Sequence, residues 1–325
     1  MHSQPVKNIK PRGNIVIWLK NSQKETFAPS YHKSDSYNEL ARALAAQHNL
    51  FFAFDAGSYK GNDIFEPVSD YISGAIMPST KQITADVIYN LGNIPDEDVK
   101  TLRAGITNTP AFKNFCASKW DTYQYLQEFS PQTIPVATEK EFVSATERIK
   151  TNTIVFKPNT GTNGIGVRIF EKDNMPFDEE IKSDIRKGAI LQEFVDTKNG
   201  IAHVCDSYHD LRIVTINETI ALTHVRTPET GSRIASYQQG ATIRELALSM
   251  LPKEIISFYS EVHKKIIARF PKSMYSMDIG MGPNGPRLFE LNGHTAFPWP
   301  DFECKTFFIE NLVAHIESFL RPQYK

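Results

Sequence analysis

The chain has 325 residues, of which 41% are hydrophobic and 22% charged, and its formal net charge is −1. These values are typical of a globular protein with a sizeable core. The charge is nearly balanced and no long run of Lys or Arg stands out, so nothing electrostatic supports binding to nucleic acid or to a membrane surface. A local phosphate site needs only a few placed cations and stays open.

The three cysteines, Cys116, Cys205 and Cys304, lie far apart and form no Cys-x-x-Cys pair. Such sparse cysteines argue against a disulfide scaffold or a metal cluster and favour a reducing compartment. The polar first 13 residues lack the apolar core of a signal peptide. No apolar run reaches the length of about 18 residues that a membrane span needs. We therefore expect a cytoplasmic protein with no membrane or nucleic-acid partner.

The first part of the chain predicts a small α/β lobe over residues 14–108, after a loose arm at 1–13. Three apolar runs are typical of buried strands: residues 14–19, 50–54 and 85–89. Ser36 and Glu39 have the spacing of a capping box, which predicts a helix that begins there.

The rest of the chain predicts a central lobe at 109–188 and a carboxy-terminal lobe at 189–325. Ser118 is expected to cap one helix, and a capping box at Thr138 opens another that runs to about Lys150. Apolar runs predict strands at 153–157, 167–170, 189–195, 211–216, 220–226, 274–279 and 287–292, and an apolar stripe predicts a helix at 253–270.

A glycine-rich turn follows Lys157, which ends a strand-like run. The turn contains Gly161, Gly164 and Gly166, and a second strand follows it. Because glycine has no side chain, its backbone N–H groups can approach phosphate oxygens, and the lysine adds a positive charge. With no helix after it, the turn is neither a Walker loop nor a dinucleotide fingerprint. An ordinary glycine-rich hairpin is the alternative.

Three polar residues near the end of the chain predict a metal site. Glu290 and Asn292 are two apart on one strand and so point to the same face. The glycine-rich hairpin at 280–286 can bring Asp278 beside them. Carboxylate and amide oxygens suit Mg²⁺ that bridges nucleotide phosphates. The alternative is a solvated sheet face, which the apolar neighbours in these strands disfavour.

Two further features are weaker by themselves. The strand at 189–195 runs into polar chain, where backbone groups can pair with an adenine edge, although a plain strand end is the simpler interpretation. Arg212 and Arg226 interrupt apolar strands, and arginine binds phosphate and carboxylate in a fork. Each alone is more often a surface ion pair.

In this order, from about Phe112 to Asn292, the parts resemble the ATP-grasp superfamily. The arginine strand and the following segment, from Arg226 to Gly240, look most like the glutathione-synthetase and ribosomal-protein glutamate ligase group. The resemblance implies an α+β protein with an α/β amino-terminal lobe and two α+β lobes that grip ATP.

The resemblance also implies roles for individual residues. ATP contacts are expected from Lys119, Lys157, Thr160, Gly161, Thr162, Asn163, Gly164, Gly166, Gln192, Glu193, Phe194, Val195 and Phe289. Mg²⁺, with Mn²⁺ as an alternative, would bind Asp278, Glu290 and Asn292. Arg212 and Arg226 would lie near the γ-phosphate and the acyl phosphate as catalytic residues. The acidic ribose partner stays open between Asp196 and Asp206, and the segment 293–300 matches no part of the family pattern.

The implied activity is a carboxylate–amine ligase that forms an acyl phosphate from ATP and a carboxylate, after which an amine displaces phosphate. Small-molecule or peptide carboxylates and amines are the implied substrates, and a homodimer is a class-level expectation. A phosphotransferase acting on another acceptor and a non-catalytic nucleotide-binding protein on the same fold are the alternatives, since fold alone does not choose among them. We assign no histidine as a general base.

Overall fold

The computed structural model describes residues 12–54, 56–92, 101–162, 164–295 and 297–324. Their packing divides the chain into two compact units. One unit consists of Met1–Pro110 with Phe297–Lys325, and the other is Ala111–Ala296.

The first unit is built on a six-stranded sheet with the order β5-β4-β2-β1-β7-β8, beside a two-stranded sheet of β3 and β6. The strands are β1 (Asn14–Leu19), β2 (Asn49–Phe54), β3 (Ile64–Phe65), β4 (Ser69–Ile72), β5 (Ala75–Pro78), β6 (Ile83–Thr84), β7 (Val87–Asn90) and β8 (Gly105–Thr107). β1 pairs in parallel with β2 and β7. Because both faces of such a strand are covered, β1 is a continuous apolar run with Trp18 in the core.

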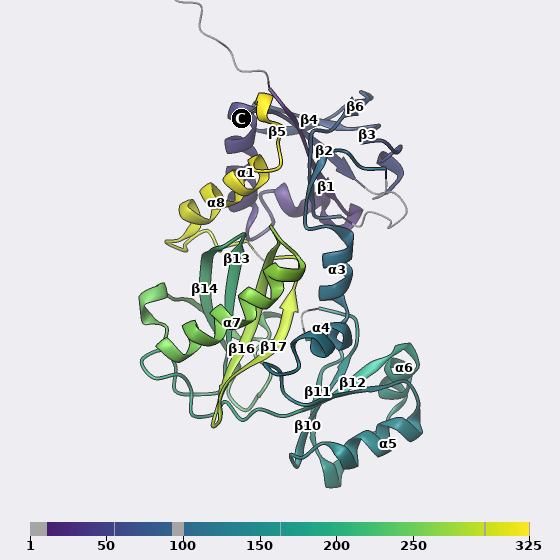
Figure 1. Cartoon of the computed structure of the whole chain (residues 1–325), viewed down its shortest axis with the longest axis vertical. Coiled ribbons are helices and arrows are strands. Elements are labelled where there is room, and N and C mark those ends of the chain that lie inside the picture. Colours follow the sequence, from purple (N-terminus) through teal and green to yellow (C-terminus); the bar gives the residue numbers. More distant parts are fainter. Residues whose placement is uncertain (1–11, 55, 93–100, 163, 296, 325) are drawn as a thin grey trace, which may run out of the picture. The chain divides into compact units, whose positions relative to one another are not determined.

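The last helix of the chain packs in this first unit. Helix α8 (Lys305–Glu317) lies beside α1 (Ser34–Gln47) in Figure 1 and contacts it. The sequence predicted that residues 297–325 belong to the carboxy-terminal lobe. The structure places them elsewhere, because their aromatic side chains pack on α1, where Phe297 stacks on Tyr37 at 3.8 Å.

The capping box predicted at Ser36 is wrong. Helix α1 begins at Ser34, so Ser36 lies inside the helix. Its hydroxyl donates to the carbonyl of Pro298 at 3.0 Å. The hydrogen bond that was expected to start the helix therefore joins the helix to the carboxy-terminal segment.

The second unit contains a four-stranded sheet with the order β11-β10-β12-β9. Its elements are β9 (Thr133–Val136), α5 (Glu139–Arg148), β10 (Thr153–Pro158), β11 (Arg168–Glu171), α6 (Glu179–Lys187) and β12 (Ala189–Glu193). Helices α5 and α6 lie together beside this sheet in Figure 1 and share one apolar core with it. Thr138 caps α5 as predicted, whereas α6, which Asp178 caps, was not predicted.

A five-stranded antiparallel sheet with the order β15-β14-β13-β16-β17 completes the second unit. Its elements are α3 (Pro110–Ala117), α4 (Lys119–Leu126), β13 (Asp210–Ile216), β14 (Thr219–Thr227), β15 (Thr242–Glu245), α7 (Lys253–Arg269), β16 (Met274–Gly282) and β17 (Gly285–Asn292). The apolar stripe of α7 packs on this sheet in a core that also includes residues of α3 and α4 (Figure 1).

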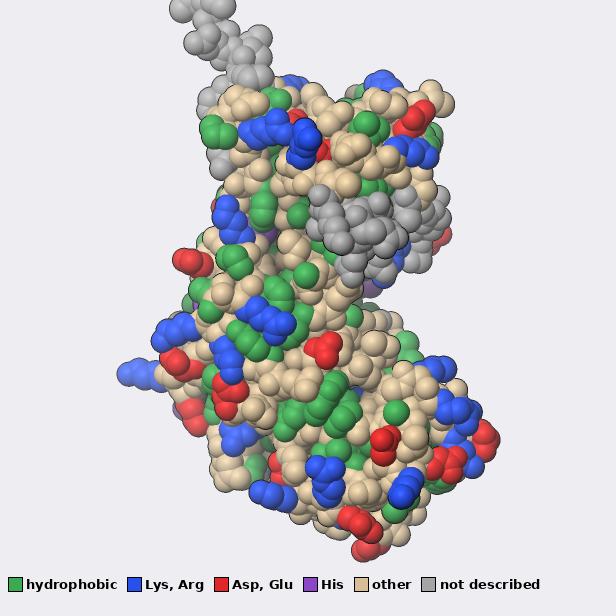
Figure 2. All heavy atoms as spheres, turned by 45° about the vertical axis from the view of Figure 1, so that its right-hand side comes forward, with side chains coloured by type: hydrophobic (Ala, Val, Ile, Leu, Met, Phe, Trp, Pro, Cys, Tyr) green, Lys and Arg blue, Asp and Glu red, His purple; other side chains and the backbone are tan. Residues whose placement is uncertain are grey.

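Charged side chains of both signs share the surface of the protein. Figure 2 shows Lys and Arg side chains interspersed with Asp and Glu over the face that it presents. Among the described residues, no helix is both long enough and apolar enough to cross a bilayer.

Candidate active site

The β16–β17 hairpin brings together the three predicted metal ligands. In its register Asp278 lies opposite Glu290, and Ser276 lies opposite Asn292. The Asn292 amide donates to Asp278 Oδ2 at 3.3 Å. The hairpin strands are longer than predicted, because the turn between them is tight, with Gly285 at a φ of +89°.

Two arginines converge on the Asp278 carboxylate. Arg212 of β13 donates from Nε to Oδ1 and from Nη2 to Oδ2, both at 2.6 Å. Arg226 of β14 lies with Nη2 2.9 Å from the same Oδ2 and 2.6 Å from Oδ2 of Asp210. Asp278 is 2% exposed, so these contacts are made largely away from water. We call Arg212, Arg226, Asp210 and Asp278 the charge network.

The charge network moves the pKa values of its two carboxyls in opposite directions. Burial alone would raise the pKa of Asp278, but Arg212 and Arg226 lower it well below its usual range. Burial raises the pKa of Asp210, and Arg226 only partly opposes this effect. Asp278 is therefore a permanent anion near neutral pH, whereas Asp210 holds its charge less firmly.

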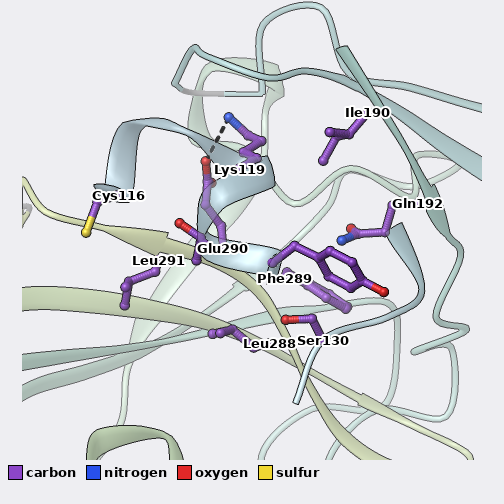
Figure 3. Close-up of a pocket in the computed structure, with 11 residues that line it drawn as sticks. Cys116, Lys119, Ser130, Ile190, Gln192, Leu288, Phe289, Glu290 and Leu291 are labelled. Atoms are coloured by element: carbon purple, nitrogen blue, oxygen red, sulfur yellow. Dashed lines mark ion pairs between the residues drawn. The ribbon is translucent and has the colours of Figure 1, made fainter. Parts of the chain in front are cut away.

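Lys119 connects the β16–β17 hairpin to the glycine-rich turn. Its Nζ lies 3.2 Å from Glu290 Oε1 and donates to the carbonyl of Gly161 at 2.9 Å. Figure 3 shows the Lys119 side chain pointing toward the carboxylate of Glu290. Ser118 caps α4 at Asp121, so Lys119 stands in the first turn of that helix.

Lys157 lies at the end of β10 with an uncharged partner. Its Nζ donates to Gln192 Oε1 at 2.7 Å, and Gln192 in turn donates to Thr133 Oγ1 at 2.9 Å. The ammonium also lies 5.9 Å from the centre of the Phe289 ring. Burial lowers the pKa of Lys157 to about 8, although Glu290 opposes this shift.

The glycine-rich turn adopts backbone conformations that favour glycine. Gly164 and Gly166 have φ values of +70° and +75°, and a Cβ on Gly166 would lie 2.7 Å from Pro158 Cγ. Thr160, Gly161, Thr162 and Gly166 line a hollow that Asp184 and neighbouring residues of α6 close. The predicted contact Asn163 lies outside the described residues.

The predicted hinge, residues 192–195, spans the end of β12, which the sequence placed two residues later, at Val195. β12 ends at Glu193, whose N–H donates to the carbonyl of Gln132 at 2.8 Å. Within the described part of the chain, the N–H of Val195 donates to no protein group. Phe194 lies under the Arg233 guanidinium at 5.5 Å.

A pocket lies between α4, β12 and β17. Figure 3 shows Ile190 and Gln192 on the side opposite Cys116 and Leu291. It is lined by Cys116, Lys119, Thr122, Tyr123, Ser130, Ile190, Gln192, Leu288, Phe289, Glu290 and Leu291. Three predicted ATP contacts, Lys119, Gln192 and Phe289, therefore share one pocket with the predicted metal ligand Glu290, while residues of the turn line the other hollow.

The sequence interpretation gave no role to two residues that organise the site. Asp210 anchors Arg226, and the only signal for it was its place two residues before Arg212 on the same strand. Asn159 accepts from the N–H of Trp120 at 2.8 Å through its side chain and from the N–H of Lys119 at 3.0 Å through its carbonyl. It thereby holds the start of α4 against the turn, a long-range contact that no local pattern reveals.

The donor atoms fit a hard divalent cation. Asp278, Glu290 and Asn292 offer two carboxylates and one amide oxygen, the ligand types that Mg²⁺ prefers. Among the described residues no group of three His, Cys, Asp or Glu side chains gathers as a metal cluster, so the amide is needed to complete the set. Both carboxylates face cations in the structure, Glu290 at Lys119 and Asp278 at the two arginines.

Comparison with known proteins identifies the domain. Residues 116–267 match the family model of the ATP-grasp domain. No curated protein sequence matches the chain.

Solved structures share the fold over nearly the whole chain. D-alanyl-alanine synthetase A from Vibrio cholerae is 11% identical with a TM-score of 0.62, covering 95% of this chain and 98% of its own. An ATP-grasp RimK domain protein from Sphaerobacter thermophilus is 14% identical with a TM-score of 0.55, covering 94% and 99%. The ATP-grasp ligase PsnB, in complex with a minimal precursor, Mg and ADP, is 16% identical with a TM-score of 0.56, covering 97% and 100%.

At these identities the likeness concerns the fold. It confirms the predicted α+β class and the ATP-grasp fold, whose two sheets in the second unit carry the residues described above. The chain therefore has the ATP-grasp fold, and its residues 116–267 match the ATP-grasp domain.

Proposed function

We propose that this protein is an ATP-dependent carboxylate–amine ligase that acts through an acyl phosphate. The observation that carries the proposal is the charge network beside the Lys119–Glu290 pair. Two arginines lie next to two carboxylates on one sheet, and Asp278 of this network is the cross-strand neighbour of Glu290, which lines the pocket with Lys119. A transferring phosphoryl group needs such closely placed cations and metal-binding oxygens.

The chain's own residues can divide the work. Lys119 and Lys157 would bind the nucleotide phosphates, with Phe289 against the base and the hinge at 192–195 pairing with its edge. Arg212 and Arg226 would neutralise charge at the transferring phosphate and hold the acyl phosphate. The glycine-rich turn, joined to Lys119 through the Gly161 carbonyl, would exclude the water that hydrolyses such an intermediate.

Mg²⁺ held by Asp278, Glu290 and Asn292 would supply charge neutralisation at the phosphates. A carboxylate oxygen of the first substrate attacks the γ-phosphorus, and the bond to ADP breaks. The amine nitrogen of the second substrate then attacks the acyl carbon. The carbon–oxygen bond to phosphate breaks, and the amine loses its proton to give the amide.

The activities named for these similar structures support a ligase over the alternatives. One is a D-alanyl-alanine synthetase, one is called a ligase, and a further structure with the same fold is D-cycloserine synthetase DcsG, at 10% identity and a TM-score of 0.60. The identity of the carboxylate and of the amine does not follow from these names, so the test must leave both open.

The experiment incubates the full chain with MgATP and pools of amino acids, short peptides and small carboxylic acids. Phosphate release and product masses are followed together. The expected result is phosphate release that needs two pool members, with a product lighter than their sum by one water. The Glu290→Gln variant should lose turnover by about a hundredfold or more, because a metal ligand and the partner of Lys119 are removed together.

Other products would contradict the ligase. A phosphorylated acceptor without condensation would show a phosphotransferase instead. Turnover that survives Glu290→Gln unchanged would show that the chemistry lies away from this pocket. The matched control is Glu261→Gln, because Glu261 forms an exposed ion pair with Lys264 on α7 and contacts none of the pocket residues.

A further inference from the structure

Arg226 contacts two carboxylates through a single terminal nitrogen of its guanidinium. Its Nη2 lies 2.6 Å from Asp210 Oδ2 and 2.9 Å from Asp278 Oδ2. Arg226 stands on β14 and Asp278 on β16, and β13 lies between these strands in the sheet. The arginine therefore reaches across a whole strand to contact Asp278, while Asp210 is its direct cross-strand neighbour.

Arg212 makes a different pair with Asp278. Its Nε and Nη2 both donate to the carboxylate at 2.6 Å, one to each oxygen, and Arg212 is the direct cross-strand neighbour of Asp278. This is the fork geometry in which arginine binds a carboxylate most strongly. Arg226 forms no such fork with either of its aspartates.

Two buried atoms in the charge network lack a hydrogen bond. Asp210 Oδ1 and Arg226 Nε are both shielded from solvent, and neither has a partner among the described residues. One is an acceptor and the other a donor, and both belong to a pair that already shares one hydrogen bond. Because a buried polar atom without a partner is costly, the observed arrangement favours completing the fork between Arg226 and Asp210.

The Asp278 oxygen that Arg226 contacts is crowded with donors. Oδ2 accepts from Arg212 Nη2, lies 2.9 Å from Arg226 Nη2, and lies 3.3 Å from the Asn292 amide nitrogen. A divalent cation approaching this oxygen must displace one of these groups. Arg226 contacts Asp278 through one nitrogen, whereas Arg212 uses two, and Arg226 already contacts a second carboxylate, that of Asp210.

We propose that Arg226 is an internal counter-ion that occupies Asp278 until a divalent cation displaces it onto Asp210. In the displaced state Arg226 completes its fork with Asp210, through Nε to Oδ1 and Nη2 to Oδ2. The same movement frees Asp278 for the metal. Metal binding without nucleotide is therefore weak. The nucleotide phosphates that bind with the cation favour the displaced state of Arg226, because a ligand shifts such an equilibrium by its difference in affinity for the two states.

The inference rests on the metal site assumed in the proposed function, but its test needs neither a carboxylate nor an amine substrate. Mn²⁺ binding to the full chain is measured by electron paramagnetic resonance, once without nucleotide and once with ADP in excess. The ratio of the two dissociation constants reports the coupling. Association of Mn²⁺ with ADP in solution is the same for every variant and cancels in the comparison.

Arg226→Gln should tighten Mn²⁺ binding about tenfold without ADP, because no guanidinium then competes with the metal for Asp278. With ADP the effect should be much smaller, because Arg226 has already moved to Asp210 in the wild type. The ratio therefore falls. Asp210→Asn should weaken binding chiefly with ADP, because the displaced arginine has lost its receiving carboxylate. Arg244→Lys is the control, since Arg244 on β15 donates to the Val204 carbonyl and not to Asp278.

Two results would overturn the counter-ion. A purely electrostatic effect would shift both dissociation constants of Arg226→Gln by the same factor and leave the ratio unchanged. Mn²⁺ binding that is insensitive to Glu290→Gln would show that the metal binds elsewhere. Melting curves accompany each variant, and the Asp210→Asn measurement tests the displaced state if Arg226→Gln does not fold. If the protein fails the ligase assay but shows the predicted ratios, the counter-ion role of Arg226 stands and the proposed reaction is wrong.

Discussion

The two sheets of the second unit both present cations to the site, but they compensate them differently. On the sheet of β9 to β12, the partly buried Lys157 donates to Gln192, which has no charge. On the sheet of β13 to β17, Arg212 and Arg226 face Asp278 and Asp210 in close ion pairs. Lys157 therefore loses its proton at a lower pH than an ordinary lysine, whereas the arginines stay charged.

This difference matters because the cost of a buried charge depends on its partner. A lysine without an anion lowers its pKa when it is desolvated, whereas an arginine beside a carboxylate stays charged. We infer that the positive charge of Lys157 on the first sheet gains a directly bonded anion only when a phosphate binds. The second sheet holds charges that are already balanced and must be rearranged before a metal can bind.

Removal of Asp278 is expected to have the largest effect on stability. Asp278→Ala leaves two buried guanidiniums without their shared anion, and we expect a loss of about 3–5 kcal/mol in the free energy of unfolding. Urea unfolding followed by circular dichroism measures it. The control Glu261→Ala removes an exposed ion pair and should cost less than about 1 kcal/mol. Equal losses in both variants would show that the charge network is not the balanced structure described here.

The weakly held charge of Lys157 predicts a pH dependence. Its pKa is lowered to about 8, so the ammonium is present below pH 8 and is lost as the pH rises above it. Affinity for MgADP should fall by up to about tenfold from pH 7 to pH 9.5. Isothermal titration calorimetry measures it, and Lys157→Met should remove the slope. A slope that persists in this variant would assign the titration to another group.

The same lysine predicts the opposite trend for stability. Its folded pKa lies below the usual value of about 10.4, so the unfolded chain binds more protons between these values and the unfolding free energy rises with pH there. Lys157→Met should not show this rise between pH 8 and pH 10.

His209 tests whether neutral groups also stabilise the second sheet. Its Nε2 accepts from the N–H of Met281 at 3.1 Å, and burial lowers its pKa. The folded state therefore prefers the neutral ring, so its contribution is present above pH 6.5 and is lost as the pH falls below it. We expect wild type to lose about 1 kcal/mol relative to His209→Gln between pH 7 and pH 5. Parallel urea-unfolding curves at both pH values would contradict this.

The smallest effect is expected where two loops of the second unit meet. Gln239 donates to the Gly164 carbonyl at 3.1 Å, and Gly164 lies against Ser236. Gln239→Ala should leave global stability within about 0.5 kcal/mol, because the group is exposed. Hydrogen exchange at Ile165 should become faster. Unchanged exchange would show that this contact does not restrain the turn.

Much of the site was predictable because its parts are local. Period-two alternation placed Glu290 and Asn292 on one face, and the glycine-rich hairpin predicted Asp278 beside them, as the register shows. The cap at Ser118 also depends on neighbouring residues, which is why the sequence located it. The strands predicted to end at Lys157 and Val195 end instead at Pro158 and Glu193. The order of these parts was enough to predict the ATP-grasp fold.

What the sequence could not supply were choices between partners that are distant along the chain. Ser36 looked like a helix cap, but a carbonyl of the carboxy-terminal segment accepts its hydrogen bond. Residues 297–325 looked like an extension of the last lobe, but their aromatic side chains pack on α1. Arg226 looked like a phosphate ligand, and only the folded sheet shows that it divides its guanidinium between Asp210 and Asp278. Local patterns determine where strands, turns and charges occur along the chain, whereas the pairing of buried charges depends on which strands become neighbours, and that is decided by tertiary packing.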